Sequence, residues 1–82
     1  MFYIYILQSE LDYSYYVGFT ENIENRVYEH NFGRTGYSKS KRPWKLIYSE
    51  RFETRTEAIK REKYLKRLKS RKYIEKLVVK GP

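Results

Sequence analysis

Residues 16–30 read YVGFTENIENRVYEH, and this stretch decides how the chain is organised. It begins as a strand, breaks at Gly18 and restarts as a helix. On that helix Arg26 and His30 are four residues apart, so they lie on the same face. Because Tyr16 precedes the break, the stretch predicts a strand-to-helix junction that brings together a tyrosine, a glycine, an arginine and a histidine.

The residues before this stretch predict the other half of a β-hairpin. Residues 2–7 alternate as in a strand, and because both of their sides carry apolar residues we expect this strand to be central in its sheet. Residues 9–12, which read SELD, have the composition of a turn. Residues 13–19 then form the return strand.

A four-residue loop in this hairpin would fix the pairing of the two strands. Tyr5 would lie opposite Tyr16, and Tyr3 would lie opposite Gly18, on the same face of the ribbon. Directly opposed side chains in an antiparallel pair are about 5 Å apart. We therefore expect two tyrosines to meet across the hairpin.

The first helix has a clear beginning and end in the sequence. Thr20 or Asn22 provides its N-cap by accepting a backbone hydrogen bond, and Gly33 marks its end. Residues 34–43 contain Gly, Ser and Pro and predict a loop. Cations in such a loop would either hold a phosphate backbone or point into solvent. The loop cations that we assign to nucleic acid are Lys39, Lys41 and Arg42.

Two residues near this helix allow two interpretations each. Asn31 would either cap the helix or bind phosphate, and we favour the cap. Trp44, which follows Pro43, would either lie in the core or offer a stacking surface for bases, and we favour the core.

The second half of the chain predicts one strand and two helices. Thr54 followed three residues later by Glu57 is a capping box, which opens the second helix. Ser70 caps a shorter third helix. The predicted order is therefore β-β-α-β-α-α, with strands over 2–7, 13–19 and 44–52 and helices over 22–33, 54–68 and 70–78.

The second helix carries a carboxylate on its apolar side. At about 100° per residue, with Ala58 set at 0°, Leu65 lies near 340°, Ile59 near 100° and Glu62 near 40°. Burying an unpaired charge is costly. Glu62 therefore either extends to the rim, pairs with an arginine, or holds a metal ion at the mouth of a site.

Positive charge is concentrated at the C-terminal end. Residues 1–59 contain equal numbers of basic and acidic residues, and residues 60–82 account for the whole net charge of +8. This asymmetry indicates a polyanionic partner, most simply nucleic acid, although a basic helical face is also compatible with simple solvation. The cations of this region that we assign to nucleic acid are Lys66, Lys69, Arg71 and Lys72.

Composition excludes several classes of protein. The 82 residues, with 40% hydrophobic and 18% aromatic content, allow one domain over residues 1–82. The chain has no cysteine, hence no disulfide and no thiolate metal site. No apolar run reaches the roughly 18 residues of a membrane span, and the N-terminus lacks the pattern of a signal peptide. We expect a cytoplasmic protein without a membrane partner.

Five elements of the sequence together resemble the GIY-YIG nuclease domain. Their order and spacing make this a strong signal, whereas either short tyrosine motif alone would be weak. The resemblance covers essentially the whole chain and is closest to small stand-alone bacterial members, which are similar to the N-terminal domain of the excision-repair nuclease subunit. The elements are Tyr3-Ile4-Tyr5, Tyr16-Val17-Gly18, Arg26, His30 and the Ala58-Ile59-x-x-Glu62 helix.

The resemblance implies an α+β fold, a three-stranded antiparallel sheet flanked by helices, and metal-dependent cleavage of nucleic-acid phosphodiesters. Tyr5 and Tyr16 match the two family tyrosines that meet at the site. Arg26 matches the family arginine, and Glu62 matches the single glutamate that binds the metal, Mg²⁺ or Mn²⁺. His30 stands where relatives carry a histidine or tyrosine beside the phosphate. As the general base we rank Tyr5 first, Tyr16 second and His30 third.

The sequence departs from the family pattern at two positions. Tyr3 replaces the glycine of the first motif, a position that is less constrained than the tyrosine that follows. Phe19 replaces the lysine that often follows the second motif, so one positive charge near the phosphate is missing.

The leading hypothesis is a metal-dependent endonuclease of DNA, acting on branched, nicked or damaged duplex. RNA stays open as a substrate, and the sequence does not reveal the oligomeric state. One rival hypothesis is a nucleic-acid-binding module without useful catalysis. Another is a nuclease subunit that needs a protein partner for targeting.

Overall fold

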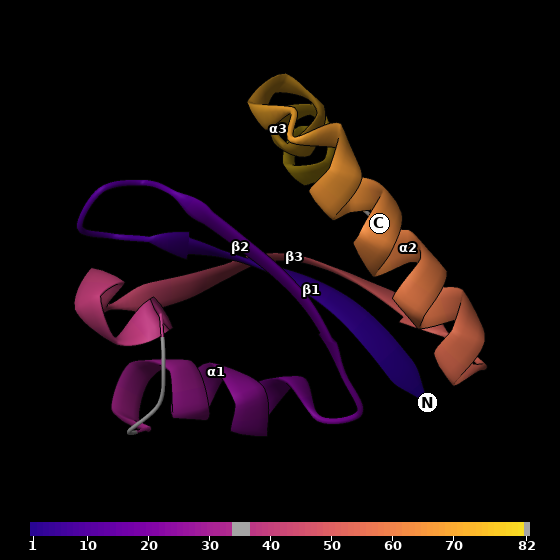
Figure 1. Cartoon of the computed structure of the whole chain (residues 1–82), viewed down its shortest axis with the longest axis horizontal. Coiled ribbons are helices and arrows are strands. Elements are labelled where there is room, and N and C mark those ends of the chain that lie inside the picture. The colour runs from indigo at the N-terminus through magenta and orange to yellow at the C-terminus, as the bar shows by residue number, and fades with distance from the viewer. Residues whose placement is uncertain (34–36, 82) are drawn as a thin grey trace.

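The computed structural model describes residues 1–33 and 37–81, so residues 34–36 of the predicted loop and Pro82 lie outside it. Three strands and three helices follow one another in the predicted order, with an additional short 3₁₀ helix before the third strand (Figure 1). The elements are β1 (Phe2–Ser9), β2 (Tyr15–Thr20), α1 (Ile23–Phe32), η1 (Tyr37–Lys41), β3 (Trp44–Phe52), α2 (Arg55–Leu68) and α3 (Arg71–Lys80).

The sheet is antiparallel with the strand order β2-β1-β3, which confirms the predicted α+β fold and the central position of β1. Helix α1 covers one face, and α2 and α3 cover the other (Figure 1). Each face carries its own apolar cluster. Buried members on the α2 and α3 face include Ile4, Ile6, Tyr48, Ala58 and Leu65, and those on the α1 face are Tyr5, Leu7 and Trp44.

The register of the hairpin differs from the prediction by two residues. Tyr5 pairs with Gly18, and Leu7 pairs with Tyr16. Because side chains alternate with a period of two, this shift leaves both tyrosines on the same face. They are diagonal neighbours instead of directly opposed ones.

The cause of this shift is a longer loop between β1 and β2. The Ser9 hydroxyl accepts the backbone N–H groups of Leu11 and Asp12. The Asp12 carboxylate then accepts the N–H and the hydroxyl of Ser14. Tyr13 adopts the left-handed conformation, with φ of 63°. These local bonds extend the turn, so that β2 begins at Tyr15 and not at residue 13.

Strand β3 has its predicted bounds, Trp44–Phe52, but it contains a bulge. Its pairing with β1 skips one residue at Ile47. Trp44 and Tyr48 consequently belong to the apolar clusters on opposite faces of the sheet. Strict alternation along residues 44–52 predicts Trp44, Leu46 and Tyr48 on one face of the sheet, and the bulge makes this prediction wrong.

The predicted N-caps are confirmed in all three helices. The side chain of Asn22 accepts the N–H of Asn25, and Ser70 accepts the N–H of Tyr73. Thr54 accepts the N–H of Glu57, as its capping box predicts. None of the helices in the described ranges is long and apolar enough to cross a membrane.

Candidate active site

Four of the five predicted site residues line one open cavity of about 540 Å³. Tyr5 comes from the central strand, Tyr16 from the edge strand β2, Arg26 from α1 and Glu62 from α2. The cavity lies beside the strand-to-helix junction, where Gly18, Thr20 and Asn22 complete its wall. Residues that are far apart in the sequence thus form a single concave surface.

His30 lies behind this cavity and reaches it through Tyr5. Its side chain is buried, and its Nε2 atom lies 3.1 Å from the Tyr5 hydroxyl oxygen. The ring of Tyr16 packs edge-on against His30, with centroids 4.5 Å apart. The Nδ1 atom of His30 has no hydrogen-bond partner within residues 1–33 and 37–81.

Burial favours the neutral forms of both partners in this pair. Desolvation, reinforced by Tyr16, raises the pKa of Tyr5 well above its ordinary value of 10.0. Desolvation, reinforced by the charge of Arg26, lowers the pKa of His30 below its ordinary value of 6.5. At neutral pH a phenol therefore faces an imidazole, and one proton lies between their oxygen and nitrogen.

Gly18 allows Tyr5 to take this position. A Cβ atom at residue 18 would lie 2.5 Å from the Tyr5 hydroxyl oxygen and 2.7 Å from the ring carbon that carries it. The Tyr5 ring thus lies directly across the glycine with which it pairs in the sheet. Any larger residue at this position would displace the tyrosine.

Glu62 is mostly buried but faces the cavity. Its side chain is 15% exposed, and one carboxylate oxygen lies 3.6 Å from the Nζ atom of Lys66, one helical turn further along α2. Within residues 1–33 and 37–81 this carboxylate pairs with a lysine, and not with the arginine that was one of the three alternatives. The Nε atom of Arg26 lies 3.9 Å from the Oε1 atom of Glu29 on the exposed side of α1, and half of the Arg26 side chain is accessible.

The donor set fits a hard divalent cation that keeps most of its water. In the described ranges, no group of three or more His, Cys, Asp or Glu residues is arranged to hold a metal ion. Mg²⁺ is often bound by one or two carboxylates together with substrate phosphates and water. A single carboxylate at the wall of an open cavity, as Glu62 provides, is compatible with that mode.

Arg55 is a cavity residue that the sequence did not reveal. It lines the cavity from the first turn of α2, and its guanidinium carbon lies 5.7 Å from the ring centroid of Phe19. A cation at a helix N-terminus opposes the helix macrodipole. That unfavourable placement was the available signal. Arg55 brings a positive charge to Phe19, the position where the expected lysine is missing.

Two of the three nucleic-acid ligands predicted in the loop before β3 are engaged within the fold. The Nζ atom of Lys41 lies 3.3 Å from the carboxylate of Asp12. Arg42 donates from Nε to the His30 carbonyl at 2.7 Å and from Nη2 to the carbonyl of Gly33, so it satisfies the C-terminal end of α1. Lys39 and Lys72 are exposed.

Asn31 and Trp44 together tie α1 to β3. The Asn31 side chain donates to the Trp44 carbonyl at 3.0 Å and accepts the Trp44 N–H at 2.6 Å. Asn31 therefore serves neither as the predicted cap nor, in this arrangement, as a free phosphate donor. Trp44 is 3% exposed and lies in the core, as predicted.

The family resemblance that the spacing of the site residues suggested is supported by comparison with known proteins. The model of the GIY-YIG catalytic domain matches residues 1–74. The chain belongs to the GIY-YIG family. Membership identifies it with a family of nucleases, in which divalent metals are generally used.

Similar GIY-YIG proteins include small bacterial proteins of the group called UPF0213. One from Staphylococcus saprophyticus is 41% identical over 80 residues, covering 96% of this chain and 95% of that protein. One from Listeria innocua is 48% identical over 67 residues, covering 80% and 73%. The solution NMR structure of a UPF0213 protein from Bacillus halodurans has a TM-score of 0.60 at 33% identity, covering 96% of this chain and 84% of that one.

Proposed function

We propose that residues 1–82 act as one divalent-metal-dependent endonuclease domain that hydrolyses DNA phosphodiester bonds in the cytoplasm. The observation that carries this proposal is the cavity, in which four separate elements present two tyrosines, a carboxylate and two guanidinium groups. Membership of the GIY-YIG family supports the same reaction class. Hydrolysis requires an activated water and stabilisation of the charge that develops on the phosphate, and the cavity offers groups for both.

Arg26 and Arg55 are the groups that bind the phosphate. A guanidinium cannot lose its proton at physiological pH and presents several N–H donors to phosphate oxygens. Among the residues that the structure describes, the charged partner of Arg26 is Glu29 at 3.9 Å, and half of the Arg26 side chain is accessible, so it remains available to substrate. Glu62 would hold Mg²⁺ or Mn²⁺, which when bound neutralises charge on the phosphate and on the leaving oxygen.

Tyr5 and His30 move the proton of the attacking water. When the Tyr5 hydroxyl donates to Nε2 of His30, the lone pairs of the Tyr5 oxygen are available on the cavity side. Tyr5 accepts a proton from water while its own proton passes to His30, so no free phenolate is required. The raised pKa of Tyr5 makes this relay preferable to a phenolate base.

The test is cleavage of labelled branched, flapped, nicked, linear and single-stranded DNA, and of matching RNA, with Mg²⁺ or Mn²⁺. We expect cleavage by the wild type and a loss of at least about 100-fold in Glu62→Gln, the scale of removing one group that stabilises transition-state charge. Glu75→Gln, on the exposed face of α3, is the matched control and should keep full activity. Inactivity of the wild type on every substrate, or full activity of Glu62→Gln, would refute the proposal.

A nucleic-acid-binding module without cleavage is the second candidate, because the whole net charge of +8 resides in residues 60–82. It predicts binding that weakens steeply with salt and is unchanged in Glu62→Gln and Arg26→Ala.

A protein partner for targeting is tested by comparing cleavage by the purified chain with cleavage after addition of cell lysate.

A further inference from the structure

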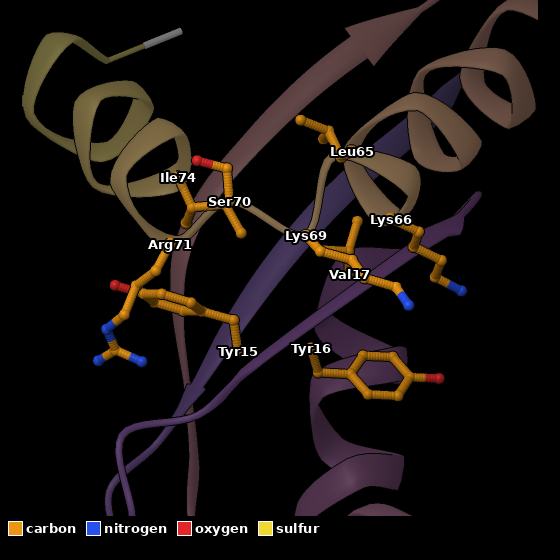
Figure 2. Close-up of a pocket in the computed structure, with 9 residues that line it drawn as sticks. All are labelled: Tyr15, Tyr16, Val17, Leu65, Lys66, Lys69, Ser70, Arg71 and Ile74. Carbon is orange, nitrogen blue, oxygen red and sulfur yellow. The ribbon is translucent and has the colours of Figure 1, made fainter.

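A second hollow lies next to the candidate active site, between β2 and the junction of α2 with α3 (Figure 2). It encloses about 360 Å³, within the range of roughly 300–1,000 Å³ found for small-molecule sites. Its floor is apolar and comes from three elements. The floor residues are Val17 of β2, Leu65 of α2 and Ile74 of α3.

Cations stand on both sides of this groove. Figure 2 shows Lys66 and Lys69 on the side toward which the hydroxyl of Tyr16 points, and Arg71 with Tyr15 on the other side. The guanidinium carbon of Arg71 lies 4.7 Å from the ring centroid of Tyr15. Arg71 also donates to the Tyr13 carbonyl at 3.1 Å, which holds it in this stacked position.

The groove is continuous with the candidate active site. Tyr16 lines both hollows, and Lys66 of the groove lies one helical turn beyond Glu62 of the cavity. Both hollows follow β2, which is an edge strand of the sheet. A strand of nucleic acid that enters the cavity therefore passes the groove within a few nucleotides.

We propose that this groove binds an unpaired nucleobase next to the cleaved phosphate, so that the substrate carries a single-stranded segment at this point. The placement of the base beside a cleaved phosphate rests on the proposed endonuclease function. Substrates of this class are nucleic acids with flaps, branches or unpaired ends, as opposed to continuous duplex.

The chemistry of the groove favours a base over a phosphate. A phosphate placed on Val17, Leu65 and Ile74 would lose its water without gaining hydrogen bonds, which is unfavourable. A base has an apolar π face that stacks on aromatic rings and on guanidinium planes, and the Tyr15–Arg71 pair offers both. The rim cations then reach the phosphates on either side of the base.

The cost of extruding a paired base disfavours an intact duplex as the ligand of this groove. A paired base is inside the helical stack and enters a protein pocket only after extrusion from it, which costs unstacking and unpairing energy. An already unpaired nucleotide avoids this cost. The groove thus discriminates by structure, and nothing in its apolar floor reads hydrogen-bonding edges of particular bases.

The test measures binding of a fluorescent DNA duplex with a short unpaired arm, in EDTA to prevent cleavage. A single abasic nucleotide is moved along the arm, one position at a time from the junction. We expect one position to weaken binding about tenfold, the scale of one lost base stack, and the others to have little effect. A scan with no effect, or with equal effects at all positions, would overturn the inference.

Two variants connect that position to the groove. Tyr15→Leu keeps an apolar side chain but removes the ring, and it should abolish the difference between the abasic and the normal arm. Lys69→Gly removes a rim cation and should lower the slope of log affinity against log salt by about one. Lys60→Ala, an exposed lysine on the opposite side of α2, is the matched control and should leave the abasic scan unchanged. An unaltered scan in Tyr15→Leu would contradict the assignment.

The two proposals fail separately. Cleavage by the wild type together with a flat abasic scan removes the groove and leaves the endonuclease. A position-dependent scan without cleavage of any substrate removes the endonuclease and leaves the groove as a site for an unpaired base.

Discussion

Gly18 is the residue on which the position of Tyr5 depends. The predicted strand break at Gly18 is wrong, because β2 continues through this residue to Thr20. The structure instead assigns Gly18 a steric role, since a Cβ atom would meet the Tyr5 hydroxyl oxygen at 2.5 Å. Tyr5 is 2% exposed and bonded to His30, so it has little room to move aside.

We predict that Gly18→Ala breaks the Tyr5–His30 hydrogen bond while the chain stays folded. Cleavage should fall at least about tenfold, in line with the loss of a positioned proton-transfer group, and nucleic-acid binding should change little. Kinetics on the best substrate, with binding by fluorescence anisotropy, would check both. Tyr5→Phe should cause a similar loss, and the double variant should be no worse than either. Additive losses would show that the two residues act independently.

The lowered pKa of His30 has a consequence for stability. The unfolded imidazole takes up a proton near its ordinary pKa of 6.5, whereas the folded one stays neutral to lower pH because burial and Arg26 disfavour its charge. Below pH 6.5 the unfolded state therefore binds more protons, and the free energy of unfolding falls as pH falls.

Urea denaturation between about pH 7.5 and 5.5 tests this sign. The wild type should lose more stability across this interval than His30→Gln, which has no titrating ring. Equal losses in the two chains would mean that His30 titrates in the folded state as it does in the unfolded state.

The junction between α2 and α3 carries local strain. Lys69 ends α2 in the left-handed conformation, with φ of 48°. This region of conformational space costs a residue with a Cβ atom about 1 kcal/mol, and glycine is the usual occupant of such a helix end.

We predict that Lys69→Gly leaves the unfolding free energy unchanged or raises it by up to about 1 kcal/mol, because relief of strain offsets the greater freedom of glycine in the unfolded chain. Thermal or urea denaturation would measure it. Lys60→Gly, in the middle of α2, should instead destabilise by about 1 kcal/mol. Destabilisation of similar size at both positions would contradict the strained geometry at Lys69.

At the level of elements, sequence predicted which segments form strands and helices but not their registers. The caps at Asn22, Thr54 and Ser70 could be predicted because in each of them one side chain bonds to a backbone group three residues away. The register of the hairpin was not, since it depends on a network of bonds among Ser9, Asp12 and Ser14. The bulge in β3 likewise arises from pairing with a distant strand.

Across the whole molecule, a polar network connects the sheet with both helices on one face. Arg61 of α2 donates two hydrogen bonds to Glu50 of β3, at 2.9 and 3.1 Å, and one to the Tyr73 hydroxyl of α3 at 3.4 Å. Tyr48 also donates to Glu50, and burial, together with this bond, raises its pKa to about 12. The network stands on the face opposite α1.

We predict that Glu50→Ala destabilises the fold by about 2 kcal/mol, because it leaves the guanidinium of Arg61 and the Tyr48 hydroxyl without their acceptor. In a chain of 82 residues this corresponds to a lower melting temperature by roughly 10 °C. Glu53→Ala, an exposed glutamate three residues later, should change the melting temperature by less than about 3 °C. Similar shifts in both variants would show that the network contributes little.

The sequence predicted only part of the site, because the rest depends on contacts between elements that are far apart in the chain. Tyr5, Tyr16, Arg26 and Glu62 followed from motif order, and the cavity brings all four together. Arg55 was missed although its place at the N-terminus of α2 offered a signal, and the apolar groove could not be predicted, because it arises where α2 lies against β2 and no local pattern encodes that contact. The spacing of residues predicted the motif residues, and the packing of distant elements determined the remaining residues of the site.

His30 gives the molecule one more property. Of the residues of α1, it is the one that is buried, so the same imidazole that faces Tyr5 also anchors the helix to the sheet. One side chain therefore serves both the proposed proton transfer and the packing of α1 on the sheet. A substitution of His30 would impair both. A descendant that abandoned cleavage would still need this histidine, or a replacement anchor, to keep α1 in place. Retention of a histidine here in a relative is thus no proof that the relative still cuts.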